Sequence, residues 1–269
     1  MISLSVNLNK IALLRNSREG NYPDLLSHAK TCIAAGAHGI TVHPRPDQRH
    51  IRPSDVFELA TLLEDMDGLE FNIEGNPFAR AQGSYPGLLA LVEETRPDQC
   101  TLVPDSNDQL TSDHGFDLTS SADTLEPVIE KLHTWGVRVS LFMDPDPKQL
   151  TLARDLKADR VELYTGPYAQ DWPDSSRRLG SFQRYRNAAV HASEIGLGLN
   201  AGHDLNLDNL PLFATLPGLL EVSIGHALIV DALAIGLESS VRAYRHILEA
   251  HAAGTDIGDK DSQSEQRRP

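Results

Sequence analysis

The sequence predicts an α/β fold, a closed barrel of eight parallel strands that alternate with helices. Three observations support this prediction. Short apolar segments of strand length alternate with longer segments of helical periodicity over nearly all of the 269 residues. The first strand is followed by Asn-Leu-Asn-Lys, whereas a doubly wound open sheet is expected to carry a glycine-rich turn there. No linker divides the chain, and about 250 residues is the usual size of one barrel.

Eight segments have the length and apolar pattern of strands. They cover residues 2–8, 39–43, 69–73, 99–103, 137–143, 160–164, 196–201 and 219–224. Helical periodicity predicts helices over residues 23–35, 53–63, 85–95, 123–135, 184–195, 208–215 and 227–250, and another that begins at Pro147. Residues 11–18 are predicted to be a connecting segment. Residues 105–121 are polar and too long for a simple connection, so they predict a functional loop.

The same pattern sets the expected domain organisation. Residues 1–253 are predicted to form a single barrel domain. Residues 254–269 are almost entirely polar and are predicted to be a disordered C-terminal tail, because they contain too few apolar side chains to form a core.

Composition narrows the classes of partner. The formal net charge is −14, from 24 basic and 38 acidic residues, which argues against nucleic acid because no basic surplus is available for phosphates. No run of about 18 apolar residues occurs, so no membrane partner is expected. The two cysteines, Cys32 and Cys100, have no Cys-x-x-Cys spacing and suggest a reduced, cytoplasmic protein.

Polar residues follow or end most of the predicted strands. In a barrel of this type the chemistry takes place at the C-terminal ends of the strands. A single histidine at a strand end is more often structural than catalytic, but three on one rim favour proton transfer, since imidazole has an ordinary pKa of about 6.5. The residues at these ends are Asn7, His43 with Arg45, Glu74, Asp144, Glu162, His203, and Gly225 with His226.

A carboxylate on the third strand is the candidate base. Glu70, Asn72 and Glu74 alternate along the strand and therefore share one face, which is plausibly the barrel interior. Glu74 is nearest the C-terminal end, and burial there would raise its pKa toward that of a useful base. Glu70 lies deeper and suits a structural role, although it is close enough to Glu74 to compete for the role of base. The alternative for Glu74 is a purely structural bond to a neighbouring His or Arg, and Glu162 is expected to be a supporting carboxylate.

The loops after the last two strands predict phosphate binding. Barrels often hold phosphate there with backbone N–H groups, and Gly202 and Gly225 permit close approach. Asp204 would repel a phosphate and is expected instead to cap the following helix. Arg18, Arg45 and His50 are candidates for a second anionic group. A metal site is the rival interpretation, but no His-x-His or His-x-x-x-His spacing favours it.

Together these motifs resemble the pyridoxine 5′-phosphate synthase family. The similar segments are VNLNKIALLRNSR (6–18), GITVHPR (39–45), RHI (49–51), FNIE (71–74), LVP (102–104), NAGH (200–203) and IGHA (224–227). The resemblance implies a (β/α)8 TIM barrel with extra helices, assembly as a homo-octamer built from dimers, and no metal or organic cofactor. It also implies condensation of 1-deoxy-D-xylulose 5-phosphate with 3-amino-2-oxopropyl phosphate to pyridoxine 5′-phosphate, with release of phosphate and water.

The resemblance also implies roles for individual residues. His43 and Glu74 would be proton acceptors and His203 the proton donor. Asn7 would contact the phosphate of the aminoketone. The other implied substrate contacts are Asn9, Lys10, Arg18, Arg45, His50, Thr111, Asp204, Gly225 and His226. Many members have Asp-His in place of Asn9-Lys10 and Gly in place of Asp204, so the contacts at these positions stay open.

Two other functions remain as alternatives. The first is another phosphosugar-processing barrel enzyme, such as an aldolase or epimerase. A Schiff-base aldolase would carry a lysine inside a strand, and none of the eight predicted strand cores has one. The second is a phosphometabolite-binding protein without catalysis, which the departures at Asn9-Lys10 and Asp204 suggest.

Overall fold

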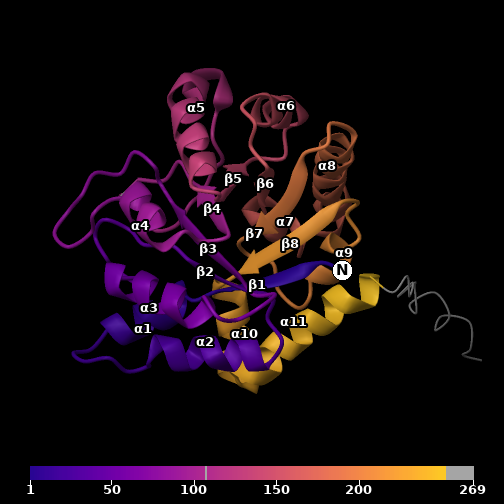
Figure 1. Ribbon diagram of the computed structural model, residues 1–269. Coiled ribbons are helices and arrows are strands. Elements are labelled where there is room, and N and C mark those ends of the chain that lie inside the picture. Colours follow the sequence, from indigo (N-terminus) through magenta and orange to yellow (C-terminus); the bar gives the residue numbers. More distant parts are fainter. Residues whose placement is uncertain (107, 253–269) are drawn as a thin grey trace, which may run out of the picture.

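A closed parallel barrel forms the centre of the molecule (Figure 1). The computed structural model describes residues 1–106 and 108–252, so the predicted tail lies outside the described residues. The strands pair in chain order and β8 returns to β1, which confirms the predicted α/β barrel. Each predicted strand overlaps one of the observed strands: β1 (Ser3–Asn7), β2 (Gly39–Val42), β3 (Glu70–Gly75), β4 (Gln99–Leu102), β5 (Arg138–Met143), β6 (Arg160–Tyr164), β7 (Gly198–Gly202) and β8 (Leu219–Ile224).

Helices surround the barrel on its outer side (Figure 1). They are α1 (Asn9–Asn16), α2 (Leu25–Ala34), α3 (Pro53–Leu63), α4 (Leu88–Thr95), α5 (Leu118–Thr134), α6 (Pro147–Asp155), α7 (Gly166–Asp171), α8 (Ser175–Glu194), α9 (Leu210–Phe213), α10 (His226–Ile235) and α11 (Leu237–Ala252). Four begin after an aspartate whose carboxylate accepts a hydrogen bond from a backbone N–H of the first turn: Asp24, Asp117, Asp146 and Asp174.

The helices differ from the prediction in several places, among them the start of α8 at Ser175, nine residues before the predicted 184–195. Residues 11–18 were expected to connect two elements, but α1 covers most of them because Ile11, Ala12 and Arg15 form one buried face. The last predicted helix is two helices, α10 and α11, separated at Gly236, whose φ of 87° is not helical. Helix α5 begins before the predicted start, at the Asp117 cap, and the short α7 was not predicted.

The barrel interior is polar, whereas the apolar core lies between the strands and the helices. Side chains such as Leu4, Ile40 and Val161 are fully buried on the outer face of the barrel wall. Inside, Asn72 donates to Thr41 (3.4 Å) and accepts from Thr101 (3.1 Å). Barrels of this class usually fill this space with Val, Ile and Leu. This chain therefore has a hydrogen-bonded floor beneath its C-terminal rim.

The predicted alternation of β3 is confirmed. Asn72 and Glu74 are both buried inside the barrel. Glu70 lies at the opposite end of the strand, where its carboxylate forms an ion pair with Arg138. Glu70 is therefore structural, as its depth in the strand suggested.

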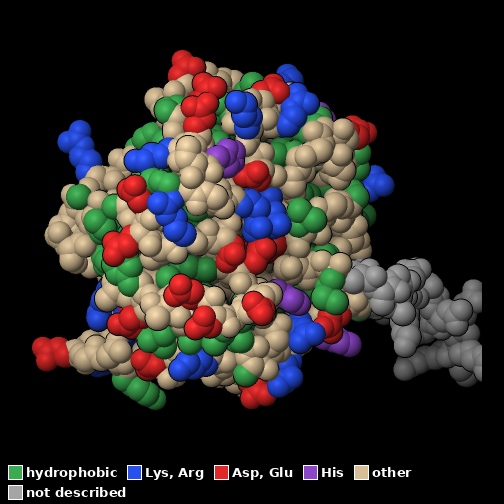
Figure 2. Space-filling model, in the orientation of Figure 1, with side chains coloured by type: hydrophobic (Ala, Val, Ile, Leu, Met, Phe, Trp, Pro, Cys, Tyr) green, Lys and Arg blue, Asp and Glu red, His purple; other side chains and the backbone are tan. Residues whose placement is uncertain are grey.

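The outer surface carries mixed charge. On the face that Figure 2 shows, acidic and basic side chains are interspersed. Of the helices in the described part of the chain, none combines the length and apolar character needed to cross a membrane.

Candidate active site

The C-terminal ends of the strands surround a cavity of about 460 Å³. All but one of the predicted site residues line it, although they come from most of the length of the chain. These residues are Asn7, Asn9, Lys10, His43, Arg45, His50, Glu74, Thr111, His203, Asp204, Gly225 and His226.

The imidazole of His43 lies between two carboxylates. Its Nδ1 is 3.8 Å from Oε2 of Glu74, and its Nε2 is 3.3 Å from Oδ2 of Asp105. All three side chains are buried. This arrangement places a carboxylate within 4 Å of each ring nitrogen of His43.

Two asparagines fix the end of β1 beside this group. Asn7 donates from Nδ2 to Oε2 of Glu74 over 3.4 Å, and its Oδ1 accepts from the backbone N–H of Asn9. The Asn9 side chain in turn accepts from the backbone N–H of His43 over 2.9 Å. Asn9 therefore holds His43 in position, and this contact does not require a bound substrate.

Burial raises the pKa of Glu74 to about 7, and the charges of Glu221 and Asp105 act in the same direction, while His43 opposes them. A carboxyl group with this pKa exchanges a proton readily at neutral pH. Deeper in the barrel, burial and the nearby Glu74 and Glu221 raise the pKa of Glu162 well above its usual range. The raised pKa favours the protonated, uncharged form of Glu162, which repels the carboxylate of Glu74 less than a charged group would.

The second imidazole, His203, directly follows β7. Its ring packs against the rings of Phe142 and Tyr164, with centroid distances of 5.3 and 5.4 Å. Burial lowers its pKa to about 4, against the opposing effect of Asp204, so the imidazole is neutral at pH 7. Its φ of 87° is in the left-handed region, which is uncommon for any residue except glycine.

The long loop after β4 reaches across the cavity. Oγ1 of Thr111 lies 3.0 Å from Nε2 of His203, a contact between residues 92 positions apart. On the other side, Arg45 binds the backbone carbonyls of Ser106 and Gln109, and its Nη1 lies 3.0 Å from Oδ2 of Asp105. The loop that the sequence predicted to be functional therefore contacts residues on both sides of the cavity.

Asp105 stays charged although it is buried. Burial would raise its pKa, but His43 and Arg45 lower it by more than burial raises it. The sequence alone did not indicate this residue as part of the site. Its position just after β4 could have indicated it, because residues at the ends of other strands were predicted to belong to the site. Ser112 and Ser223 also line the cavity without having been predicted.

His50 presents a defined hydrogen-bond donor. Its Nδ1 accepts from the backbone N–H of Ile51 over 3.0 Å, which places the ring proton on Nε2. Burial, together with the neighbouring His43 and Arg45, lowers the pKa of His50 to about 3, so the ring is neutral. A neutral imidazole can donate its Nε2–H to an anionic ligand that has no proton of its own to donate.

The opposite wall is formed by the loops after β7 and β8. Helix α10 begins at His226, and a Cβ on Gly225 would lie 3.1 Å from the side chain of Asn7. A Cβ on Gly202 would lie 2.0 Å from Oε1 of Glu162. A Cβ at Gly202 would overlap the buried carboxyl group of Glu162, whereas one at Gly225 would require only a small shift of Asn7. The first N–H groups of α10 have no helical partner and are available to an anion.

Two predicted positions differ from expectation. Asp204 was expected to cap the next helix, but α9 begins after Asn209 and Asp204 lines the cavity, so that expectation was wrong. The reason is that Asn206 and Asn209 organise this loop through their own amide groups. Arg18 does not line the cavity; its exposed guanidinium donates to the carbonyl of Ser17.

Within residues 1–106 and 108–252, no group of three or more His, Cys, Asp or Glu side chains is arranged to hold a metal ion.

Comparison with known proteins gives consistent results at the level of sequence. Residues 4–250 match the family described as pyridoxal phosphate biosynthesis protein PdxJ. The chain is 57% identical to the pyridoxine 5′-phosphate synthase of Xanthomonas axonopodis pv. citri over 248 residues, 92% of this chain and 96% of that protein. It is 53% identical to the pyridoxine 5′-phosphate synthase of Xylella fastidiosa, over 92% of this chain and 95% of that protein.

Solved structures with much lower identity share the fold. Thiamine phosphate pyrophosphorylase from Pyrococcus furiosus superposes with a TM-score of 0.57 at 10% identity, over 93% of this chain and 96% of that one. The BexX/CysO complex of Amycolatopsis orientalis gives a TM-score of 0.59 at 15% identity, over 96% and 94%. At these identities the similarity describes the barrel alone.

Proposed function

This chain belongs to the family of the pyridoxal phosphate biosynthesis protein PdxJ, and from this premise we propose that it is a pyridoxine 5′-phosphate synthase. The reaction condenses 1-deoxy-D-xylulose 5-phosphate with 3-amino-2-oxopropyl phosphate and closes the pyridine ring, with release of phosphate and water. One feature of the site carries the proposal. His43, Glu74 and His203 line a single cavity together with the loops after β7 and β8, which are expected to bind phosphate.

Glu74 and His43 act as proton acceptors in the proposal. Ring closure requires imine formation, elimination and aromatisation, and each of these steps moves protons on the bound intermediate. The pKa of about 7 for Glu74 and the 3.8 Å separation between His43 and Glu74 support transfer to this pair. A positioned acid or base contributes about 10²–10⁴-fold to such a step.

His203 acts as the proton donor. Burial lowers its pKa to about 4, but a substrate phosphate bound nearby would favour the imidazolium, because an opposite charge within a few ångströms stabilises the charged form. The contact with Thr111 orients the Nε2 edge that would give the proton. Closure of the loop between β4 and α5 would keep reactive imines away from water.

The two substrate phosphates anchor the reaction at opposite sides of the cavity. One is held by Gly225, His226 and Asn7, where α10 begins. The other is held on the side of Lys10, Arg45 and His50. Fixing both substrates makes a bimolecular condensation nearly intramolecular. The remaining proposed contacts are Asn9, Thr111, Asp204 and Arg18. Of these, Arg18 lies outside the cavity, so its position does not support the proposed contact.

The direct test is product formation. Purified protein incubated with both phosphorylated substrates is expected to yield pyridoxine 5′-phosphate, identified by mass spectrometry, together with one equivalent of inorganic phosphate. Calorimetry on the same sample measures substrate binding. Tight binding without product over a range of pH and substrate concentration would reject the synthase and favour a binding protein.

The pH dependence tests the base. Glu74 must be deprotonated to accept a proton, and its pKa is raised to about 7, so kcat/KM is expected to fall as the pH drops through about 7. The fall should approach about tenfold per pH unit on the acidic side. In Glu74→Gln this limb should disappear together with at least about 10²-fold of the activity. A profile that stays flat from pH 5 to 8 in the native protein would contradict the assignment.

The proposal extends to assembly and compartment. We propose a homo-oligomer, an octamer by family resemblance. Exposed apolar side chains on α1 and α10 support association, among them Leu14 (59% exposed) and Leu233 (81% exposed). Cys32 and Cys100 are buried and unbonded, which supports a reduced, cytoplasmic setting. Residues 1–253 remain the proposed single domain.

A further inference from the structure

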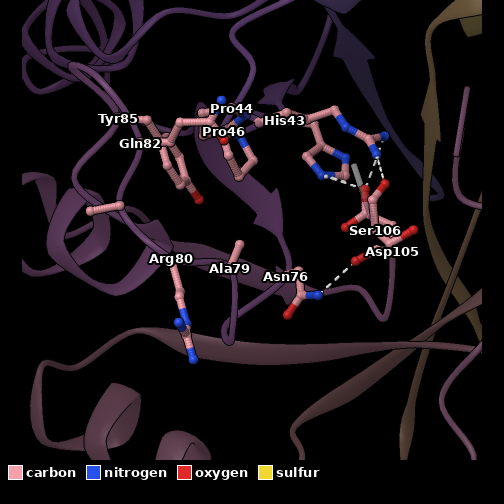
Figure 3. Close-up of a pocket in the computed structure, with 12 residues that line it drawn as sticks. His43, Pro44, Pro46, Asn76, Ala79, Arg80, Gln82, Tyr85, Asp105 and Ser106 are labelled. Carbon is pink, nitrogen blue, oxygen red and sulfur yellow. Dashed lines mark hydrogen bonds and ion pairs between the residues drawn. The ribbon is translucent and has the colours of Figure 1, made fainter. Parts of the chain in front are cut away.

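A second cavity of about 380 Å³ lies beside the candidate active site (Figure 3). The two cavities share His43 and Arg45 as lining residues. The far wall of the second cavity is the segment between β3 and α4, which contributes Asn76, Arg80 and Tyr85. No step of the proposed reaction uses that segment.

A buried hydroxyl group whose proton lacks an acceptor points into this space. Tyr85 is 1% exposed, and the proton of its hydroxyl group has no acceptor among the described residues, although the backbone N–H of Leu88 lies near the oxygen. Figure 3 shows this hydroxyl directed into the space between Arg80 and Asn76. Burial, reinforced by the charge of Asp105, raises the pKa of Tyr85 above its usual range, so the hydroxyl keeps its proton and can donate. A buried hydroxyl is destabilising unless a bonding partner arrives.

The charges around the cavity favour an anion. The one carboxylate in its lining, Asp105, is already matched by Arg45 at 3.0 Å and His43 at 3.3 Å. Arg80 is exposed and forms no ion pair or side-chain hydrogen bond with any residue in the described ranges. The buried Nε of Arg45 is also without a hydrogen-bond partner there. One positive charge and two unused donors therefore remain for a ligand.

We propose that this cavity is an accessory binding site for a small oxyanion of the size of inorganic phosphate. Arg80 supplies the charge, the Tyr85 hydroxyl donates a hydrogen bond, and the Nε–H of Arg45 is a further donor. A guanidinium is well suited to oxyanions because its planar N–H groups match their geometry. The bound anion would lie directly behind His43 and Arg45, outside the cavity that holds the substrates.

Isothermal titration calorimetry with inorganic phosphate, on the full chain at constant ionic strength, tests the site. The native protein is expected to bind phosphate in the substrate cavity and at this site. Arg80→Ala should weaken the accessory binding by at least about tenfold, and Tyr85→Phe by about threefold to tenfold, because each removes one polar contact. His226→Ala should affect the substrate cavity instead.

The control is Arg186→Ala, which removes the same charge from an exposed position on α8 that lines neither cavity. It should bind phosphate like the native protein. Thermal unfolding checks that each variant is folded. If both Arg80→Ala and Tyr85→Phe bind as many phosphates as the native protein with unchanged affinity, the accessory site does not exist. The measurement needs no turnover, so its result is independent of the synthase assay.

Discussion

His203→Asn is expected to reduce turnover at least about a hundredfold while the protein stays folded. Asparagine keeps a polar group near Thr111, and it tolerates the φ of 87° at this position better than most residues. What it lacks is a nitrogen that can accept and return a proton near neutral pH. Steady-state kinetics with both substrates at saturation measures the effect on kcat.

The matched control is His191→Asn. His191 on α8 also contacts a threonine hydroxyl, since its Nε2 lies 2.8 Å from Oγ1 of Thr151, but it does not line the cavity. Its substitution should leave kcat within about twofold of the native value, as expected of a site remote from the chemistry. An undiminished rate in His203→Asn would remove His203 from the mechanism.

The largest loss of stability is expected for Asp55→Ala. Asp55 and Arg15 form a two-pronged ion pair with distances of 2.5 and 2.8 Å, and both are buried. Removing the carboxylate leaves the guanidinium buried without its counter-ion, which costs about 3–5 kcal/mol. It also removes the acceptor for the backbone N–H of Arg52 at the start of α3.

Denaturant unfolding at fixed protein concentration measures the change, because association would otherwise alter the midpoint. Asp65→Ala, at an exposed position just beyond α3, should change the free energy of unfolding by less than about 0.5 kcal/mol. A midpoint for Asp55→Ala equal to that of the native protein would contradict the prediction. Activity should fall as well, because Arg15 also binds the carbonyl of His50 in the cavity wall.

The sequence was sufficient for the barrel and for the rim on which the chemistry lies. Alternation of apolar and polar residues predicts strands well when the two faces of the barrel wall need different residues. Strands β6 and β8 were found with their predicted limits. Polar residues at strand ends then predict a common site, because parallel strands in a barrel all end at one rim. His43, Glu74 and His203 meet there for that reason.

Only the tertiary structure decided the contacts between distant segments. Asp105 joins His43 and Arg45 because the chain after β4 turns inward, and no local pattern specifies that turn. Asp204 faces the cavity because Asn206 and Asn209 hold its loop, although the sequence suggested a helix cap. The raised pKa of Glu74 likewise depends on burial and on Glu221 from another strand. Local periodicity determines which elements form, whereas packing determines which side chains meet and how strongly each holds its proton.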